Sequence, residues 1–154
     1  LIQNALFAIA GIGRKKLSSL VMPWCTYTDP EVAHVGLYPH EAQERGMEID
    51  TFCVSLNDVD RAIVDDETEG FLKIHVNQGT DEIVGATLVA RHAGEIISQV
   101  TLAMTNGVGL GAIANTIYPY PTQAEILRKA ASQYGLKRLT TFKPLASKFL
   151  AWRR

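Results

Sequence analysis

Two apolar stretches joined by a short polar segment constrain the fold of this chain more than any other feature. Residues 71–76 alternate, which places their aliphatic side chains on one face of an extended strand and His75 on the outer face. Residues 83–90 form a second and more apolar strand. The segment between them, Asn-Gln-Gly-Thr-Asp at 77–81, has the composition of a turn. We therefore expect an antiparallel hairpin.

Further strands and helices are expected around this hairpin. The patterns predict strands over 24–28 and 48–56, and helices over 39–45, 94–105, 110–115 and 122–134. Gly135 is expected to end the last helix, and the acidic segment 58–68 is expected to be irregular. Three or four antiparallel strands with helices on one face predict an α+β fold, a two-layer sandwich. The helices are too few and too late in the chain for a doubly wound parallel sheet.

Apolar content and cysteine usage exclude several classes of protein. No apolar run approaches the roughly 20 residues of a membrane-spanning helix, and the first residues lack the features of a signal peptide. The two cysteines, Cys25 and Cys53, cannot build a disulfide framework, and each is expected to behave as a small hydrophobic residue. A reducing, cytoplasmic setting fits this usage. The chain starts at Leu1 without an initiator Met, which suggests a fragment.

Basic residues are concentrated at the C-terminal end of the chain. Residues 126–154 hold eight Lys and Arg and no acid, and the tail 136–154 carries apolar residues among these bases. Such a tail could dock on a membrane surface or on a partner, which leaves open a non-enzymatic interaction module. The other interpretation is a basic segment that lies on the acidic body of its own domain. Pro144 is expected to interrupt any long helix in this tail.

The histidines and the acidic run predict no metal site. The four histidines lie apart without metal-ligand spacing, at His34, His40, His75 and His92. The acidic residues between Asp58 and Glu69 do not follow the calcium-loop pattern, so a solvated loop is expected there.

The segment before the last predicted helix points to chemistry. Two prolines alternate with tyrosines at Tyr118-Pro119-Tyr120-Pro121, and each proline restricts itself and the residue before it. The segment is therefore stiff and presents Tyr120 at a set place. Glu125 follows in the first helical turn, where the helix dipole favours its ionised form. A phenol beside a carboxylate can orient a ligand or donate a proton, but the same residues could form a structural turn with a capping acid.

The segment resembles the His-Pro-Thr-x-x-Glu signature of the flavin disulfide reductases. It stands here as Tyr120-Pro121-Thr122-Gln123-Ala124-Glu125. Residues 26–36 are similar to the Phe-Thr-x-Pro-Glu-Ile-Ala-x-Val-Gly stretch of the same family, and Gly94-Glu95-Ile96-Ile97 matches a third, less specific segment. The three matches follow the order of the family and together span residues 20–135, nearly the whole chain.

The resemblance implies the C-terminal dimerisation domain of a class I pyridine nucleotide–disulfide oxidoreductase. It places this domain at 21–135, between a lead-in segment at 1–20 from upstream FAD and NAD(P)H domains and the basic tail at 136–154. It implies a homodimer, without a nucleic-acid partner, in which the signature loop of one subunit completes the active site of the other. FAD and NAD(P)H are implied for the full-length enzyme. The isolated chain is expected to bind neither of them and to be inactive.

One departure from the signature bears on the reaction. Tyr120 stands where the disulfide reductases have histidine, and a phenol with a pKa of about 10 is a poor proton shuttle at neutral pH. A Pro-Tyr-x-Thr-x-x-Glu pattern is that of mercuric reductases, and Pro119, Tyr120, Thr122 and Glu125 match it. The chain nevertheless ends in Leu-Ala-Trp-Arg-Arg, whereas mercuric reductases end in adjacent cysteines. The electron acceptor is therefore left undetermined.

The resemblance assigns roles to the residues of this loop. Tyr120 and Glu125 are expected to be catalytic, with Tyr120 facing the substrate and Glu125 orienting it or a neighbour. Tyr120 and Pro121 are expected to meet the flavin. Thr122 is expected to cap the last helix.

Overall fold

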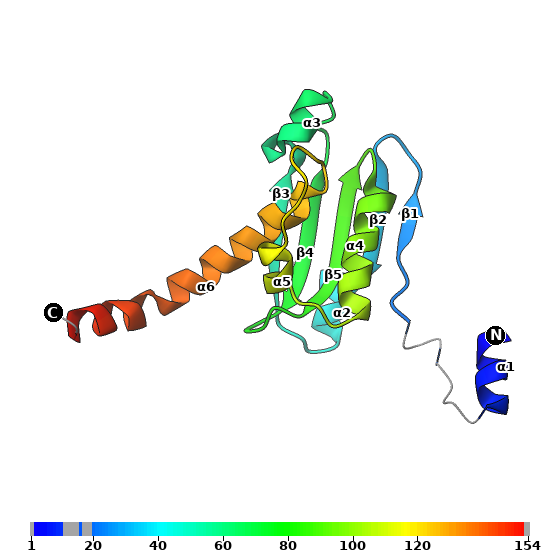
Figure 1. Ribbon diagram of the computed structural model, residues 1–154, viewed down its shortest axis with the longest axis horizontal. Coiled ribbons are helices and arrows are strands. Elements are labelled where there is room, and N and C mark those ends of the chain that lie inside the picture. The colour runs from blue at the N-terminus through cyan, green and yellow to red at the C-terminus, as the bar shows by residue number, and fades with distance from the viewer. Residues whose placement is uncertain (1, 11–15, 17–19, 153–154) are drawn as a thin grey trace.

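The computed structural model describes residues 2–10, 16 and 20–152, and it has helices packed on one face of an antiparallel sheet (Figure 1). The strands are β1 (Trp24–Thr26), β2 (Glu31–Gly36), β3 (Ile49–Ser55), β4 (Phe71–Asn77) and β5 (Ile83–Ala90). The helices are α1 (Ile2–Ile9), α2 (Pro39–Glu44), α3 (Asp60–Val64), α4 (Ala93–Thr105), α5 (Leu110–Asn115) and α6 (Glu125–Trp152), with a 3₁₀ turn, η2, at Leu56–Asp58. The predicted α+β, two-layer arrangement is confirmed.

The predicted hairpin forms the middle of the sheet. The strand order is β1-β2-β5-β4-β3, and all neighbours are antiparallel. In the hairpin, Phe71 lies opposite Val89 and Ile74 lies opposite Ala86. Strand β2, which the sequence did not predict, lies between β1 and β5 and raises the strand number to five. Its sequence, Glu-Val-Ala-His-Val-Gly, has two strong strand formers, the valines, so its strand conformation depends on pairing with both neighbours as well as on local preference.

One hydrophobic core lies between the sheet and helices α4, α5 and α6, which Figure 1 shows in front of the sheet. Burial of each large aliphatic side chain contributes about 1.5–3 kcal/mol. Every second residue of the inner strands faces this core, and so does one side of each helix. The largest aliphatic members with almost no exposure are Leu56, Leu72, Ile74, Leu88, Ile97, Leu110, Ile126 and Leu127. The core fixes where α6 begins, and with it the loop that precedes α6.

The face of the sheet away from this core carries two buried histidines. His75 was predicted to lie on an outer face, but only 2% of it is exposed. Its Nδ1 lies 2.8 Å from the hydroxyl of Thr51, and Nδ1 of His34 lies 2.9 Å from the hydroxyl of Thr87. Tyr38 stacks on the ring of His34, with 3.8 Å between ring centroids. His75 therefore lies on the predicted face of the strand, but alternation does not predict that this face is covered.

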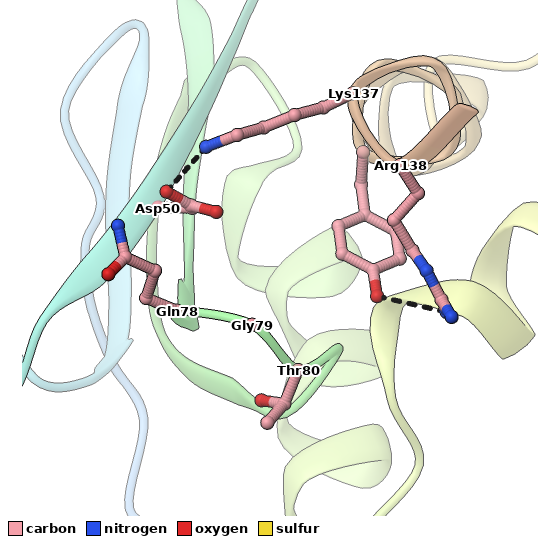
Figure 2. A pocket seen from close by; sticks show the side chains of 7 residues that line it. Asp50, Gln78, Gly79, Thr80, Lys137 and Arg138 are labelled. Carbon is pink, nitrogen blue, oxygen red and sulfur yellow. Dashed lines mark hydrogen bonds and ion pairs between the residues drawn. The ribbon is translucent and has the colours of Figure 1, made fainter. Parts of the chain in front are cut away.

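Helix α6 is longer than predicted. Gly135 does not end it, and the helix continues past Pro144 to Trp152. Figure 2 shows two contacts just after Gly135: Lys137 reaches Asp50 of β3 at 2.6 Å, and Arg138 donates to the hydroxyl of Tyr134 at 3.3 Å. These contacts, together with good helix formers after Gly135, outweigh the cost of about 1 kcal/mol for an interior glycine.

The two cysteines differ from each other in exposure. Cys25 is half-buried and packs against the core, as predicted. Cys53 is exposed on β3, so the prediction that it behaves as a buried hydrophobic residue was wrong. It lies in the edge strand β3, on the face opposite the core residues Phe52 and Val54.

Parts of the two predicted flanking segments lie outside the described residues. These are most of the region after Ala10 in the lead-in 1–20, and the side chains of Phe142, Leu145, Phe149 and Trp152 in the tail. Leu136 and Leu139, at the start of the tail, are exposed. No helix in the described ranges is long and apolar enough to cross a bilayer. The predicted boundaries at residues 20/21 and 135/136 stay predictions.

The buried histidines predict how the stability of the chain depends on pH. Burial lowers the pKa of both His34 and His75. Unfolding returns them to about 6.5, so below that pH the unfolded chain takes up protons that the folded chain does not. Their contribution to the free energy of unfolding is therefore complete above about pH 6.5 and is lost as the pH falls. We expect a lower thermal unfolding midpoint at about pH 5.5 than at about pH 7.5.

His75→Gln tests this assignment, with His40→Gln in exposed α2 as the matched control. The drop in midpoint between the two pH values should be smaller in His75→Gln than in the wild-type chain, and unchanged in His40→Gln. Equal drops in all three proteins would mean that the buried ring of His75 does not cause the acid sensitivity.

Candidate functional site

The predicted signature segment lies in the loop between α5 and α6. Tyr118 is half-buried against the core, whereas Tyr120 is 70% exposed. The peptide bond between Tyr120 and Pro121 is cis. The hydroxyl of Thr122 donates to the carbonyl of Pro119 at 2.9 Å and does not cap the helix. The prediction of a side-chain cap was wrong, because that hydroxyl closes the turn and the backbone carbonyl of Thr122 accepts the N–H of Glu125 instead.

Tyr120 is bonded to a helix from another part of the chain. Its hydroxyl donates to Oδ2 of Asp60, the first residue of α3, at 2.7 Å. This hydrogen bond and the charge of Asp60 hold the pKa of Tyr120 above its usual value, and partial burial and the charge of Glu125 add to the effect. Segment 58–68 was predicted to be an irregular, solvated loop, but it contains α3, which lies beside the signature loop (Figure 1).

The acidic run supplies a second attachment through Gln123. The buried side-chain amide of Gln123 donates to Glu67 at 2.7 Å and to Asp65 at 3.5 Å. Each acid also meets a cation: Arg91 lies 2.5 Å from Glu67, and Arg61 lies 2.8 Å from Asp65. The amide of Gln123 and Arg91 hold the pKa of Glu67 below its usual range, and Arg61 does the same for Asp65. The acidic run thus holds the loop in place.

Sequence reasoning missed Gln123. A glutamine beside a signature motif has no distinctive pattern of its own. Its partners lie 56 and 58 residues away in the chain, so only the fold brings the three groups together.

Glu125 is 6% exposed and lies at the first position of α6. One carboxylate oxygen pairs with Arg128, while Oε2 is buried without a hydrogen-bond partner among the described residues. Glu125 and Tyr120 line the same hollow of about 380 Å³, together with Tyr118 and Arg128. The structure therefore brings the two predicted catalytic residues to one place, while the hydroxyl of Tyr120 bonds Asp60 and not Glu125.

Another hollow, of about 310 Å³, lies between α6 and the β4–β5 turn (Figure 2). Its charged residues, Asp50, Lys137 and Arg138, already hold the ion pair and hydrogen bond described above. Across the described part of the chain, no group of three or more His, Cys, Asp or Glu side chains could hold a metal ion. The signature loop is therefore the best candidate site.

The attachment through Gln123 predicts a specific loss of stability. Gln123→Glu removes the two amide donors and buries a third carboxylate beside Glu67 and Asp65. Groups of this kind cost about 2 kcal/mol when they are left unpaired. We expect the free energy of unfolding, measured with urea, to fall by about that amount.

Gln43→Glu in exposed α2 is the matched control, because it makes the same chemical change on a solvated helix. Its effect should stay within about 0.5 kcal/mol. If both variants unfold at the same urea concentration, the acidic run does not hold the loop through Gln123.

Comparison with protein families finds a match over most of the chain. A family model described as "Pyridine nucleotide-disulphide oxidoreductase, dimerisation domain" matches residues 22–131. The match includes the sheet, the helices from α2 to the first part of α6, and the whole signature loop.

The proteins with similar sequences include mercuric reductases. The chain is 36% identical over 121 residues to a mercuric reductase of Staphylococcus aureus, and 39% identical over 123 residues to one of Bacillus cereus. These alignments include 79% and 80% of this chain but only 22% and 19% of the relatives, so the chain spans about a fifth of their length.

Solved structures have the same fold. The flavoprotein disulfide reductase RclA from Escherichia coli, described as HOCl-induced, matches with a TM-score of 0.76 and 24% identity, over 84% of this chain and 30% of that one. LpdA from Mycobacterium tuberculosis matches with a TM-score of 0.77 and 25% identity, over 84% of this chain and 28% of that one.

Proposed function

The chain belongs to the pyridine nucleotide-disulphide oxidoreductase dimerisation domains, and from this we propose that it pairs with a second copy of itself to complete a flavin-dependent oxidoreductase. The observation that carries the proposal is the signature loop, which is held firmly at its base and exposed at its tip. Gln123 anchors the base, while Ile117 and Tyr120 are 94% and 70% exposed. A rigid loop with exposed apolar groups is suited to insertion into a partner.

The helix-bearing side of the chain supplies the surface for pairing. Helix α4 and the loop before α6 lie on this side of the sheet (Figure 1). They carry exposed apolar groups, Leu102 on α4 and Ile117 and Tyr120 in the loop, and Val108 just after α4 is also exposed. Exposed apolar groups gathered on one side of a domain are typical of an interaction surface. A two-fold pairing through this side would bring the loop of each copy toward the other copy.

FAD and NAD(P)H belong to the proposed full-length enzyme, in which they supply electron transfer to an acceptor. Two features of the loop fit a flavin site shared between subunits. Tyr120 and Pro121 are exposed and can meet a ring system from outside, and the buried Oε2 of Glu125 can accept a hydrogen bond from an incoming group. In this proposal Tyr120 faces the substrate and Glu125 sets the local charge.

The proposed electron acceptor follows from Tyr120, the residue at the tip of the loop. A tyrosine in place of a histidine favours an acceptor that does not need a proton from the loop, such as a soft metal ion held by thiolates. The mercuric reductases among the relatives agree with this choice. An assay of the full-length protein with Hg(II), small disulfides and quinones as electron acceptors tests this proposal. We expect Hg(II) to support NADPH oxidation. If a disulfide supports NADPH oxidation and Hg(II) does not, a metal ion is excluded as the acceptor.

The docking-module alternative is not supported. The family match ends at residue 131, before the basic tail, and the named relatives are reductases. The two cysteines are free, which fits a reducing compartment. A cytoplasmic enzyme is therefore part of the proposal.

Leu102→Glu should weaken the proposed pairing. The substitution puts a charge at an exposed apolar position of α4, where pairing would bury it without a partner. The cost should exceed about 1.4 kcal/mol, which is a tenfold rise in the dissociation constant of the dimer. Light scattering over a concentration series should show twice the chain mass of 16.9 kDa for the wild type, and a shift toward monomer for the variant.

Tyr27→Glu is the matched control, because Tyr27 is 82% exposed on the turn after β1, at the far edge of the sheet from α3. It should pair like the wild type. A wild-type chain that stays monomeric at every concentration would refute pairing by this domain alone, and equal weakening by both variants would place the interface elsewhere.

A further inference from the structure

The hydrogen bond between Tyr120 and Asp60 determines which hydrogen bonds the phenol of Tyr120 can make with another group. A phenol has one proton to donate and lone pairs on its oxygen to accept with, whereas an ionised carboxylate can only accept. The Tyr120 oxygen lies 2.7 Å from Oδ2 of Asp60, so the one proton of Tyr120 points toward α3. The rest of the phenol oxygen is free to face outward, since the side chain is 70% exposed.

Buried neighbours in the chain fix the position of the Asp60 backbone. Val59 and Ala62, its neighbours in η2–α3, have no exposed surface and belong to the core. The same segment is attached to the loop through Gln123, which bonds Glu67 and Asp65. Gln123 therefore joins segment 59–67 to the loop independently of the Asp60–Tyr120 hydrogen bond.

We propose that Asp60 is the positioning residue of Tyr120, and that it holds the phenol proton so that the oxygen lone pairs face the partner subunit. The inference rests on the proposed function, in which this face meets the partner's active site. It restricts the group that Tyr120 can meet to an electron-poor cation or a hydrogen-bond donor. A leaving thiolate, which needs a proton, is the wrong partner for this arrangement.

The charged groups around the phenol agree with this arrangement. Asp60 on α3 and Glu125 on α6 are both acidic, and both hold the pKa of Tyr120 above its usual value. Arg128 is the cation that lines the same hollow, and it is paired with Glu125. The phenol is thus kept protonated at neutral pH, with its proton on the side of Asp60.

Titration of Tyr120 in the 154-residue chain tests the inference. The chain has five tyrosines, so [¹³Cζ]tyrosine labelling gives a small set of NMR signals, and Tyr120→Phe identifies the signal of Tyr120. Asp60→Asn keeps an acceptor but removes the charge, and Asp60→Ser shortens the side chain while it keeps a hydroxyl at the start of α3. Both should lower the pKa of Tyr120, whereas Asp58→Asn in η2 should leave it unchanged.

The outcomes separate this inference from the proposed function. An unchanged Tyr120 pKa in either folded Asp60 variant, or an equal shift in Asp58→Asn, would overturn the role of Asp60 while dimerisation could still hold. Light scattering on the same samples reports dimerisation by itself. A monomeric chain in which the Asp60 variants still lower the pKa would keep the Asp60–Tyr120 pairing and refute pairing by this domain alone.

Discussion

The site depends first on the burial of one face of the sheet under α4, α5 and α6. Leu72, Ile74 and Leu88 cover this face, and Ile126 and Leu127 at the start of α6 pack into the same core. Because α6 begins inside the core, the loop before it cannot slide along the sheet. Tyr120 is therefore exposed at a fixed place, and that rigidity lowers the ordering cost that a partner would otherwise meet on binding.

Hydrogen bonds to acidic side chains also hold the loop in place. The acids that follow η2 carry out different tasks: Asp60 accepts a hydrogen bond from the phenol of Tyr120, while Asp65 and Glu67 accept from the amide of Gln123. Two arginines limit the repulsion between Asp65 and Glu67. Exposed ion pairs contribute little on their own, but here they support a buried amide whose partners would otherwise repel each other. A run that looks like a solvated loop is in this way part of the site.

The sequence predicted the hairpin, most helices and the signature loop because each has a strong local pattern. Alternation marked β4, an Asn-Gly pair marked the end of α4, and two prolines marked the segment around Tyr120. What it missed depends on contacts between distant residues. Strand β2 needs β1 and β5 on either side, burial of His75 needs a cover over the outer face, and α6 continues past Gly135 with Lys137 bound to Asp50. Likewise, the partner of Tyr120 is 60 residues away, so local reasoning chose Glu125.

The central claim is that the exposed tip of the signature loop faces a second copy of the chain. Hydrogen exchange of the backbone amides of residues 117–124, measured over a range of chain concentrations, tests it most directly. The turn at residues 78–80 serves as an internal reference, since it lines a hollow with Tyr134, Lys137 and Arg138 of α6 and with no residue of the loop. The account predicts that exchange in the loop slows as dimer forms, while the reference turn is unaffected. Loop exchange that stays constant while the solution mass doubles would contradict it.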